Sequence, residues 1–223
     1  MTPIQDFFPI WPALTDLQRQ RLSDSAVSRR AAAGQTLHRG GEDCTGLLLV
    51  RSGRLRAFAL SEEGREITLY RLTEGDICLF SAACVIRGLR FDLQITAETD
   101  TSLWLIPAKV YHALMQQSAP LANFTNQLMA DRLSDVLWLM DQVLWKRQDQ
   151  RLAAFLLQEQ ALTGSGALRI THEAIANHLG TAREVVTRML RYLQGEGMVR
   201  LGRGEIEVLS PQGLQALSAQ RRE

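Results

Sequence analysis

The sequence contains no uninterrupted apolar run of the roughly 18 residues that a membrane-spanning helix requires. Its apolar N-terminal segment, residues 1–14, contains Asp6 and no Lys or Arg, unlike the basic start of a secretory signal peptide. Cysteine is scarce: Cys44, Cys78 and Cys84 are too few, and odd in number, for a secreted disulfide framework. We therefore expect a cytoplasmic globular protein without a membrane partner.

An excess of charge of either sign is also missing, since 25 Lys and Arg residues stand against 24 Asp and Glu. Duplex DNA is bound largely through neutralisation of its phosphates, so this balance by itself argues against nucleic acid as a partner. The balance is uneven along the chain, however: residues 146–223 hold 11 basic and 8 acidic side chains. The placement of these arginines must therefore decide the question.

Common catalytic motifs are absent as well. The chain has no glycine-rich phosphate-binding loop with a Lys, no Gly-x-Ser-x-Gly turn and no His-Glu-x-x-His motif. Its Asp and Glu residues show no evident pairing. We predict that the protein is not an enzyme.

The N-terminal half carries the pattern of a β-rich domain. Glycines recur between residues 29 and 109, and the short segments between them are apolar and partly alternating. Short strands separated by glycine turns predict an antiparallel β-roll or sandwich. Ser61–Gly64 is typical of a hairpin turn, and Pro107 predicts the end of the last strand and the start of a helix to Gln117. Residues 1–117 are expected to form this domain.

A long helix is predicted from Pro120 to about Lys146, within a segment 118–146. Its apolar residues are spaced four, three, four and three apart, which is a heptad seam of only two heptads. The seam residues are Met129, Leu133, Val136, Met140 and Val143. The helix either dimerises with a second copy or packs as a core helix within its own chain.

The remaining residues, 147–223, predict a helix-turn-helix followed by a hairpin. Thr171 can cap a short helix that Gly180 ends in the left-handed conformation. Thr181 can cap the next helix, with Glu184 in the capping-box position. The glycine-punctuated segment 197–209 then alternates like a small hairpin. The predicted fold class is α+β: an antiparallel β-roll, a long helix and a winged helix-turn-helix.

The second of these helices separates charge from apolar residues. At 100° per residue, five polar side chains fall within an arc of about 140°, and the apolar residues occupy the opposite side. The polar five are Arg183, Glu184, Thr187, Arg188 and Arg191. Arginine can bind guanine bidentately in the major groove, and a carboxylate can accept from cytosine. The arc therefore predicts a DNA-recognition helix, although an exposed charged face without function has the same pattern.

Several motifs along nearly the whole chain resemble the Crp/Fnr family of bacterial transcription regulators. Gly53–Arg56, Glu63–Glu66 and Glu74–Asp76 are similar to its β-roll turns, Leu179–Arg188 to its helix-turn-helix, and Gly202–Ile206 to its wing. The resemblance implies a cyclic-nucleotide-binding-like sensor domain and a DNA-binding homodimer. It also implies a two-fold symmetric duplex site and contact with RNA polymerase.

The resemblance assigns base reading to Arg183, Glu184 and Arg188, which match the family's Arg-Glu pair and the Arg that follows it. The first Arg places this chain nearer the cyclic-AMP receptor pattern than that of the oxygen-responsive members. Further DNA contacts are expected from the rest of the arc, from Thr171 and Thr181, and from the wing arginines. The wing arginines are Arg200 and Arg203.

The sensor departs from the cyclic-AMP pattern. Phe80 stands where the family's ribose-binding Glu aligns, and Phe91-Asp92 stands where its phosphate-binding Arg-Ser pair aligns. Arg87 or Arg90 could replace the missing Arg only if the loop is rebuilt. Cyclic AMP is therefore not expected to bind in the usual way.

The sequence bears on three other classes of effector: thiol chemistry, haem and an iron–sulfur cluster. Cys78 and Cys84 could sense oxidants or bind a soft metal, but their apolar neighbours also fit buried structural thiols. Haem would need an axial ligand such as His112. A four-Cys iron–sulfur cluster cannot be built from this chain, because no Cys precedes Cys44.

A different functional class is also open. The β-roll could be a cyclic-nucleotide-type module that regulates a partner protein, with the C-terminal helices making protein contacts. The arginine arc favours DNA over this alternative. If the family mechanism applies, an effector in the roll would shift the long helix and reorient the two DNA-reading domains of a dimer.

Overall fold

The computed structural model describes residues 3–40, 45–79 and 93–220. The chain forms two compact units, residues 1–60 with 69–136 and residues 61–68 with 137–223. Within the described ranges, no helix combines the length and apolar character needed to cross a membrane.

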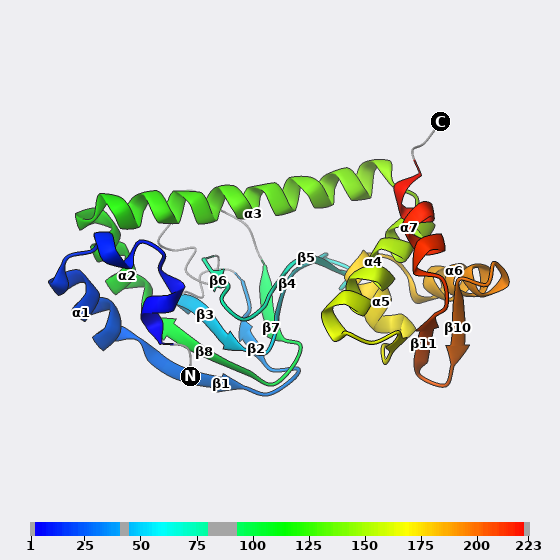
Figure 1. Ribbon diagram of the computed structural model, residues 1–223, viewed down its shortest axis with the longest axis horizontal. Coiled ribbons are helices and arrows are strands. Elements are labelled where there is room, and N and C mark those ends of the chain that lie inside the picture. Colours follow the sequence, from blue (N-terminus) through cyan, green and yellow to red (C-terminus); the bar gives the residue numbers. More distant parts are fainter. Residues whose placement is uncertain (1–2, 41–44, 80–92, 221–223) are drawn as a thin grey trace. The chain divides into compact units, whose positions relative to one another are not determined.

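Two four-stranded sheets form the β-roll (Figure 1). One has the order β1(Val27–Ala31), β8(Thr101–Ile106), β3(Leu47–Ser52) and β6(Ile77–Cys78). The other has the order β2(Thr36–His38), β7(Gln94–Ala97), β4(Leu55–Leu60) and β5(Glu66–Leu72). The pairs β1–β8, β3–β8, β3–β6, β2–β7 and β4–β7 are antiparallel. The predicted β-roll is confirmed.

Strand β3 lies between two cores. Leu48 and Val50 belong to the cluster inside the roll, whereas Leu47 and Leu49 belong to a second cluster under the N-terminal helices. Side chains of a strand alternate between its faces, so a run of four buried leucines and valines needs cover on both sides. Arg51 continues the outer face, on the same side as Leu49.

Helices cover that outer face at one end. They are η1(Ile4–Phe7), η2(Trp11–Ala13), α1(Asp16–Ser25), α2(Ala108–Gln117) and the start of α3(Ala119–Trp145). Buried Tyr111 of α2 has its hydroxyl 2.8 Å from Thr125 Oγ1 of α3. The predicted helix 108–117 is confirmed, and the long helix begins and ends one residue earlier than expected.

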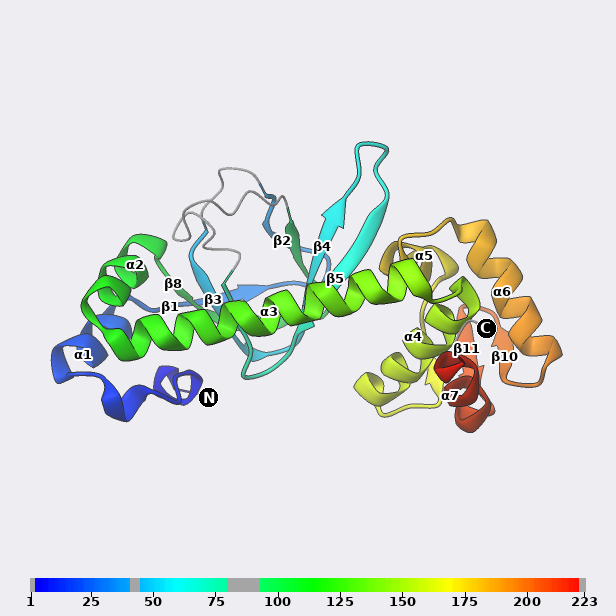
Figure 2. The same ribbon diagram turned by 90° about the horizontal axis from the view of Figure 1, so that it is seen from above.

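The second unit contains a winged helix-turn-helix (Figure 2). Its elements are α4(Gln148–Thr163), β9(Ala167–Leu168), α5(His172–Leu179), α6(Arg183–Gly195), β10(Val199–Gly202), β11(Glu205–Val208) and α7(Pro211–Ala219). The strands form a sheet of order β10–β11–β9. One apolar cluster joins these elements, and Leu152, Ile175 and Leu190 are fully buried in it. This part of the predicted fold is confirmed too.

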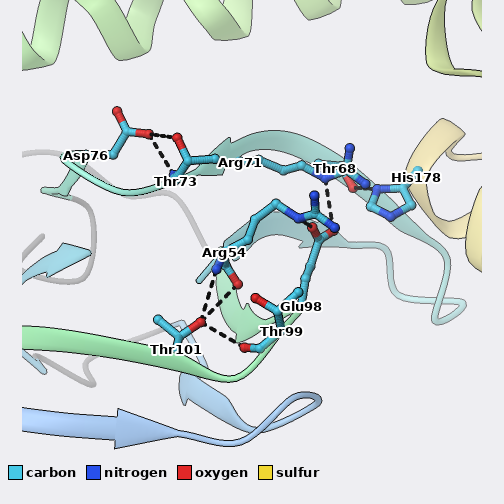
Figure 3. Close-up of polar contacts among 9 residues, drawn as sticks. All are labelled: Arg54, Thr68, Arg71, Thr73, Asp76, Glu98, Thr99, Thr101 and His178. Carbon is cyan, nitrogen blue, oxygen red and sulfur yellow. Dashed lines mark hydrogen bonds and ion pairs between the residues drawn. The ribbon is translucent and has the colours of Figure 1, made fainter. Parts of the chain in front are cut away.

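Residues 61–68, the tip of the β4–β5 hairpin, group with the helix-turn-helix. Thr68 Oγ1 lies 2.7 Å from His178 Nδ1 of α5 (Figure 3). A Cβ added at Gly180 would lie 3.0 Å from Ile67 Cδ1. The hairpin tip therefore contacts the turn between α5 and α6.

Candidate DNA-binding surface and sensor interior

Local signals position α5 as the sequence predicts. The Thr171 side chain accepts a hydrogen bond from the Ala174 backbone N–H at 3.1 Å, which caps the helix. Gly180 ends it in the left-handed region, with φ of 66°.

The start of α6 differs from the expectation. Its N-cap is Ala182, whose extended backbone has φ of −83° and ψ of 147°, and no side chain caps the helix. Thr181 lies one residue earlier in the turn, where its N–H donates to the Ala176 carbonyl at 3.1 Å. The predicted Thr181 cap and its capping box are therefore wrong. Glu184 still lies in the first turn, where the helix dipole favours a carboxylate.

The polar arc predicted for α6 is mostly exposed to solvent. Arg183, Glu184, Arg188 and Arg191 are exposed, and the apolar side holds buried Val186, Leu190 and Leu193. In the described part of the chain, none of the three arginines forms an ion pair with a carboxylate. Their guanidinium groups are therefore available for phosphates or bases.

Thr187 is already engaged within the protein. Its hydroxyl donates to the Arg183 carbonyl at 3.0 Å and lies 2.9 Å from His172 Nδ1. Such a contact joins the first turn of α5 to α6. The sequence reading missed His172, because only the crossing of two helices brings it to Thr187.

Arg151 of α4 also fixes this geometry. It is buried, and its Nη2 donates to the Leu179 carbonyl at 2.7 Å, at the C-terminal end of α5. A cation there complements the helix dipole. Burial lowers the pKa of Arg151 from its usual value, yet an arginine remains charged.

Burial, followed by the charges of Arg183 and Arg191, lowers the pKa of His172. The folded protein thus binds a proton on the His172 ring more weakly than the unfolded chain does, where a His has a pKa of about 6.5. Neutral His172 therefore makes its full contribution to the free energy of unfolding above that pH. This contribution is lost as the pH falls through the folded-state pKa of His172. We expect the urea midpoint of the wild type to drop more between pH 7.5 and 5 than that of His172→Gln. Equal drops would contradict this prediction.

The wing carries one engaged and one available arginine. Arg200 on β10 forms an ion pair with Glu207, its cross-strand partner on β11. Arg203 is exposed in the turn between the strands and has no carboxylate partner among the described residues. Arg203 is thus the better placed of the two to reach a phosphate.

The family-like turns of the roll have structural roles (Figure 3). Glu98 is paired with both Arg54 and Arg71. Asp76 Oδ2 accepts from the backbone N–H of Thr73 at 2.7 Å and from its hydroxyl at 3.1 Å. These ion pairs and hydrogen bonds hold the strands and turns around the roll interior.

The interior also contains a cation from α3. Arg132 is paired with Asp135, has Nη2 3.8 Å from Asp76 Oδ1, and has its guanidinium carbon 4.9 Å from the Tyr70 ring centre. Its Nε is buried without a hydrogen-bond partner in the described structure. Nothing in the heptad pattern marked Arg132 as a residue that links α3 to the sheets.

Cys78 is fully buried on β6, with Sγ 4.0 Å from the Tyr70 hydroxyl. Burial, and then the neighbouring Cys78, raises the pKa of Tyr70 well above its usual range. The other proposed sensor residues, Cys84, Arg87 and Arg90, lie outside the described residues, as do Phe80 and Phe91-Asp92.

His112, the candidate haem ligand, lies half-buried on α2 with Nε2 3.4 Å from Gln116 Nε2. In the described ranges no three His, Cys, Asp or Glu residues are grouped as metal ligands. The geometry therefore adds nothing in favour of a metal or haem at His112.

The seam of α3 is exposed in the single chain. Leu133, Met140 and Val143 are largely accessible, whereas Met129 and Val136 are half-buried. Leu137 and Leu144 extend this surface and are also exposed.

Comparison with known proteins agrees with both parts of the structure. Residues 28–118 match the cyclic nucleotide-binding domain, and residues 150–217 match the Crp-like helix-turn-helix domain. The cyclic AMP receptor protein of Thermus thermophilus is 32% identical over 176 residues, which cover 78% of this chain and 80% of that protein. The fumarate and nitrate reduction regulatory protein of Salmonella typhimurium is 28% identical and covers 89% of this chain and 82% of its own.

A solved structure is closer still. A crystal structure from Eubacterium rectale, assigned to the Crp/Fnr family, is 52% identical, with a TM-score of 0.94. The match covers 96% of this chain and 100% of that one. Relatives of this kind are transcription regulators and not enzymes, as the sequence predicts. The chain described here belongs to the Crp/Fnr family of DNA-binding transcription regulators.

Proposed function

We propose that this regulator acts as a homodimer that reads a two-fold symmetric duplex site with the exposed face of α6. The observation that carries the proposal is that Arg183, Arg188 and Arg191 lie beside Glu184 on one exposed face and form no ion pair with any described carboxylate. Such a face can bind guanine and cytosine edges in the major groove. Thr171 caps α5 and Thr181 lies in the turn before α6, where both are proposed to contact DNA, and Arg203 supplies a wing contact.

Dimerisation is proposed through α3. Its exposed apolar surface follows the heptad spacing expected of a helix pair, and Leu133 keeps 59% of its surface in the single chain. Monomeric proteins seldom expose a large continuous apolar patch, so a second copy is the partner that this seam fits. A symmetric dimer would place two α6 helices on half-sites about one DNA turn apart.

We propose that the sensor domain does not bind cyclic AMP in the family's usual way. Phe80 and Phe91-Asp92 stand where the family's ribose-binding Glu and phosphate-binding Arg-Ser pair align. Within the described roll, Glu98 forms ion pairs with both Arg54 and Arg71, and Arg132 contacts Asp135 and the Tyr70 ring. An effector that moves Arg132 would act directly on α3, which gives the sensor a physical link to the dimer helix. It must bind the two states with different affinity to shift their populations.

Thiol oxidation, thiol-bound metal and haem remain the effector alternatives. Cys78 is buried, which favours a packing role for it over direct reaction with solvent. We place the protein in the cytoplasm with its DNA and with RNA polymerase as the partner it would regulate.

Selection of bound duplexes from random-sequence DNA, followed by footprinting, tests the proposal. The expected result is an inverted repeat protected on two successive major grooves. Protection of an asymmetric site would overturn two-fold reading by a dimer. Recovery of no preferred sequence would overturn DNA recognition and favour a module that regulates a partner protein. Calorimetry with cyclic AMP on the same preparation tests the sensor separately, and we expect no binding at the interior site.

A further inference from the structure

The outer face of the β1–β8–β3 sheet contains an open groove of about 1140 Å³ beyond the helices that cover the rest of that face. Its polar and aromatic lining includes Ser28, Arg30, Arg51, Ser52, Ser102 and Trp104. Because β3 directs Leu48 and Val50 into the roll, Arg51 points to the opposite side. The groove is thus separate from the roll interior.

Arg51 is buried in this groove and forms no ion pair with a carboxylate of the described residues. Only 8% of its surface is exposed. Nη1 donates to Ser28 Oγ at 3.2 Å, and the guanidinium carbon lies 4.6 Å from the Trp104 ring centre. Its Nε has no hydrogen-bond partner, and no carboxylate of the described residues forms an ion pair with it.

A buried cation with one hydroxyl partner is energetically costly. Desolvation of a charge is normally offset by an opposite charge and by hydrogen bonds to each donor. The stacking on Trp104 offsets part of this cost, because cation–π contacts favour a guanidinium over a ring face. The remaining N–H donors of Arg51 fit an anion that enters the groove.

The neighbours define the charge and shape of that anion. Arg30 is exposed on β1, opposite Ser102, and adds a second cation to the groove. Glu74 and Asp100 also line it and would repel a dianion such as phosphate. A planar carboxylate matches the guanidinium geometry and brings a single negative charge.

We propose that this groove binds a small monocarboxylate whose apolar part lies against Trp104 and the nearby Pro3 and Ala32. Arg51 binds the carboxylate, Arg30 adds attraction at the open side, and the serine hydroxyls supply further hydrogen bonds. The site lies on the opposite side of β3 from the roll interior, and it does not depend on the proposed DNA contacts.

Fluorine NMR of 4-fluorobenzoate with the full chain, at constant ionic strength, tests the proposal. We expect saturable broadening that benzoate reverses. Arg51→Met should weaken binding at least roughly tenfold, in line with the loss of a charged hydrogen bond. Arg30→Gln should weaken it less, and Arg29→Gln should leave it unchanged, because Arg29 is exposed on β1 and does not line the groove.

Three results would overturn the proposal: no saturable binding, equal binding to Arg30→Gln and Arg51→Met, or stronger displacement by inorganic phosphate than by benzoate. If Arg51→Met fails to fold, wild-type binding by Arg30→Gln overturns the proposal instead, because Arg30 is exposed and its replacement leaves the core intact.

Discussion

Replacing Leu133 and Met140 together by Glu is expected to yield a monomer and to weaken operator binding more than about hundredfold, or about 3 kcal/mol. Both side chains are exposed in the single chain, so the substitutions should leave each protomer folded. In a helix pair the four new carboxylates would face one another in a desolvated seam, which is strongly unfavourable. Analytical ultracentrifugation and binding to the selected operator measure the two effects.

A matched variant separates loss of the seam from added charge. Gln127→Glu with Ser134→Glu introduces the same two charges on the same helix, at exposed positions outside the heptad seam. We expect this control to stay dimeric and to keep most of its operator affinity. A dimeric Leu133→Glu, Met140→Glu variant would exclude α3 as the dimer helix.

The parts of the fold with local causes could be predicted from the sequence. Pro107 ends a strand and starts α2, Thr171 caps α5, and Gly180 ends α5 with a positive φ. Each of these signals acts within a few residues and needs no knowledge of the rest of the chain. The amphipathic arc of α6 follows in the same way from helical geometry alone.

The start of α6 shows where such reasoning fails. Thr181 and Ala182 both precede the helix. Ala182 is the N-cap, because it has the extended backbone directly before Arg183, the first helical residue. Ile67 packs against Gly180 in the same turn, so tertiary contacts also act on these residues. A capping preference of only about 1 kcal/mol can be outweighed by such contacts.

The residues that sequence reasoning missed share one property: their contacts are made across the fold. His172 meets Thr187, Arg132 meets Tyr70, and Arg51 meets Trp104 only after helices or strands pack together. Periodicity can mark a polar residue on a buried face, but it cannot name the partner. Burial of Arg51 was therefore visible only in the structure.

Arg188→Ala is expected to cost roughly 1–3 kcal/mol of operator binding and to relax discrimination at one base pair of each half-site. Arg188 is exposed on α6, unpaired within the described structure and one turn beyond Glu184. Its loss removes a bidentate donor, and the adjacent Thr187 hydroxyl is already bonded to Arg183 and His172. Binding to the selected operator and to its single-base variants, at fixed salt, measures both effects.

Arg191→Ala provides the contrast that identifies base reading. Arg191 lies nearer the C-terminal end of α6, where we expect a phosphate contact, so its loss should weaken all duplexes about equally and lower the salt dependence. Arg29→Ala removes an equal charge from β1 and should change neither quantity. If Arg188→Ala weakens every duplex alike and leaves base preference intact, Arg188 binds the backbone, and sequence recognition must rest on Arg183 and Glu184. Because the whole chain carries only one basic residue more than its acidic ones, general attraction to DNA is weak, and specificity must come from such base contacts.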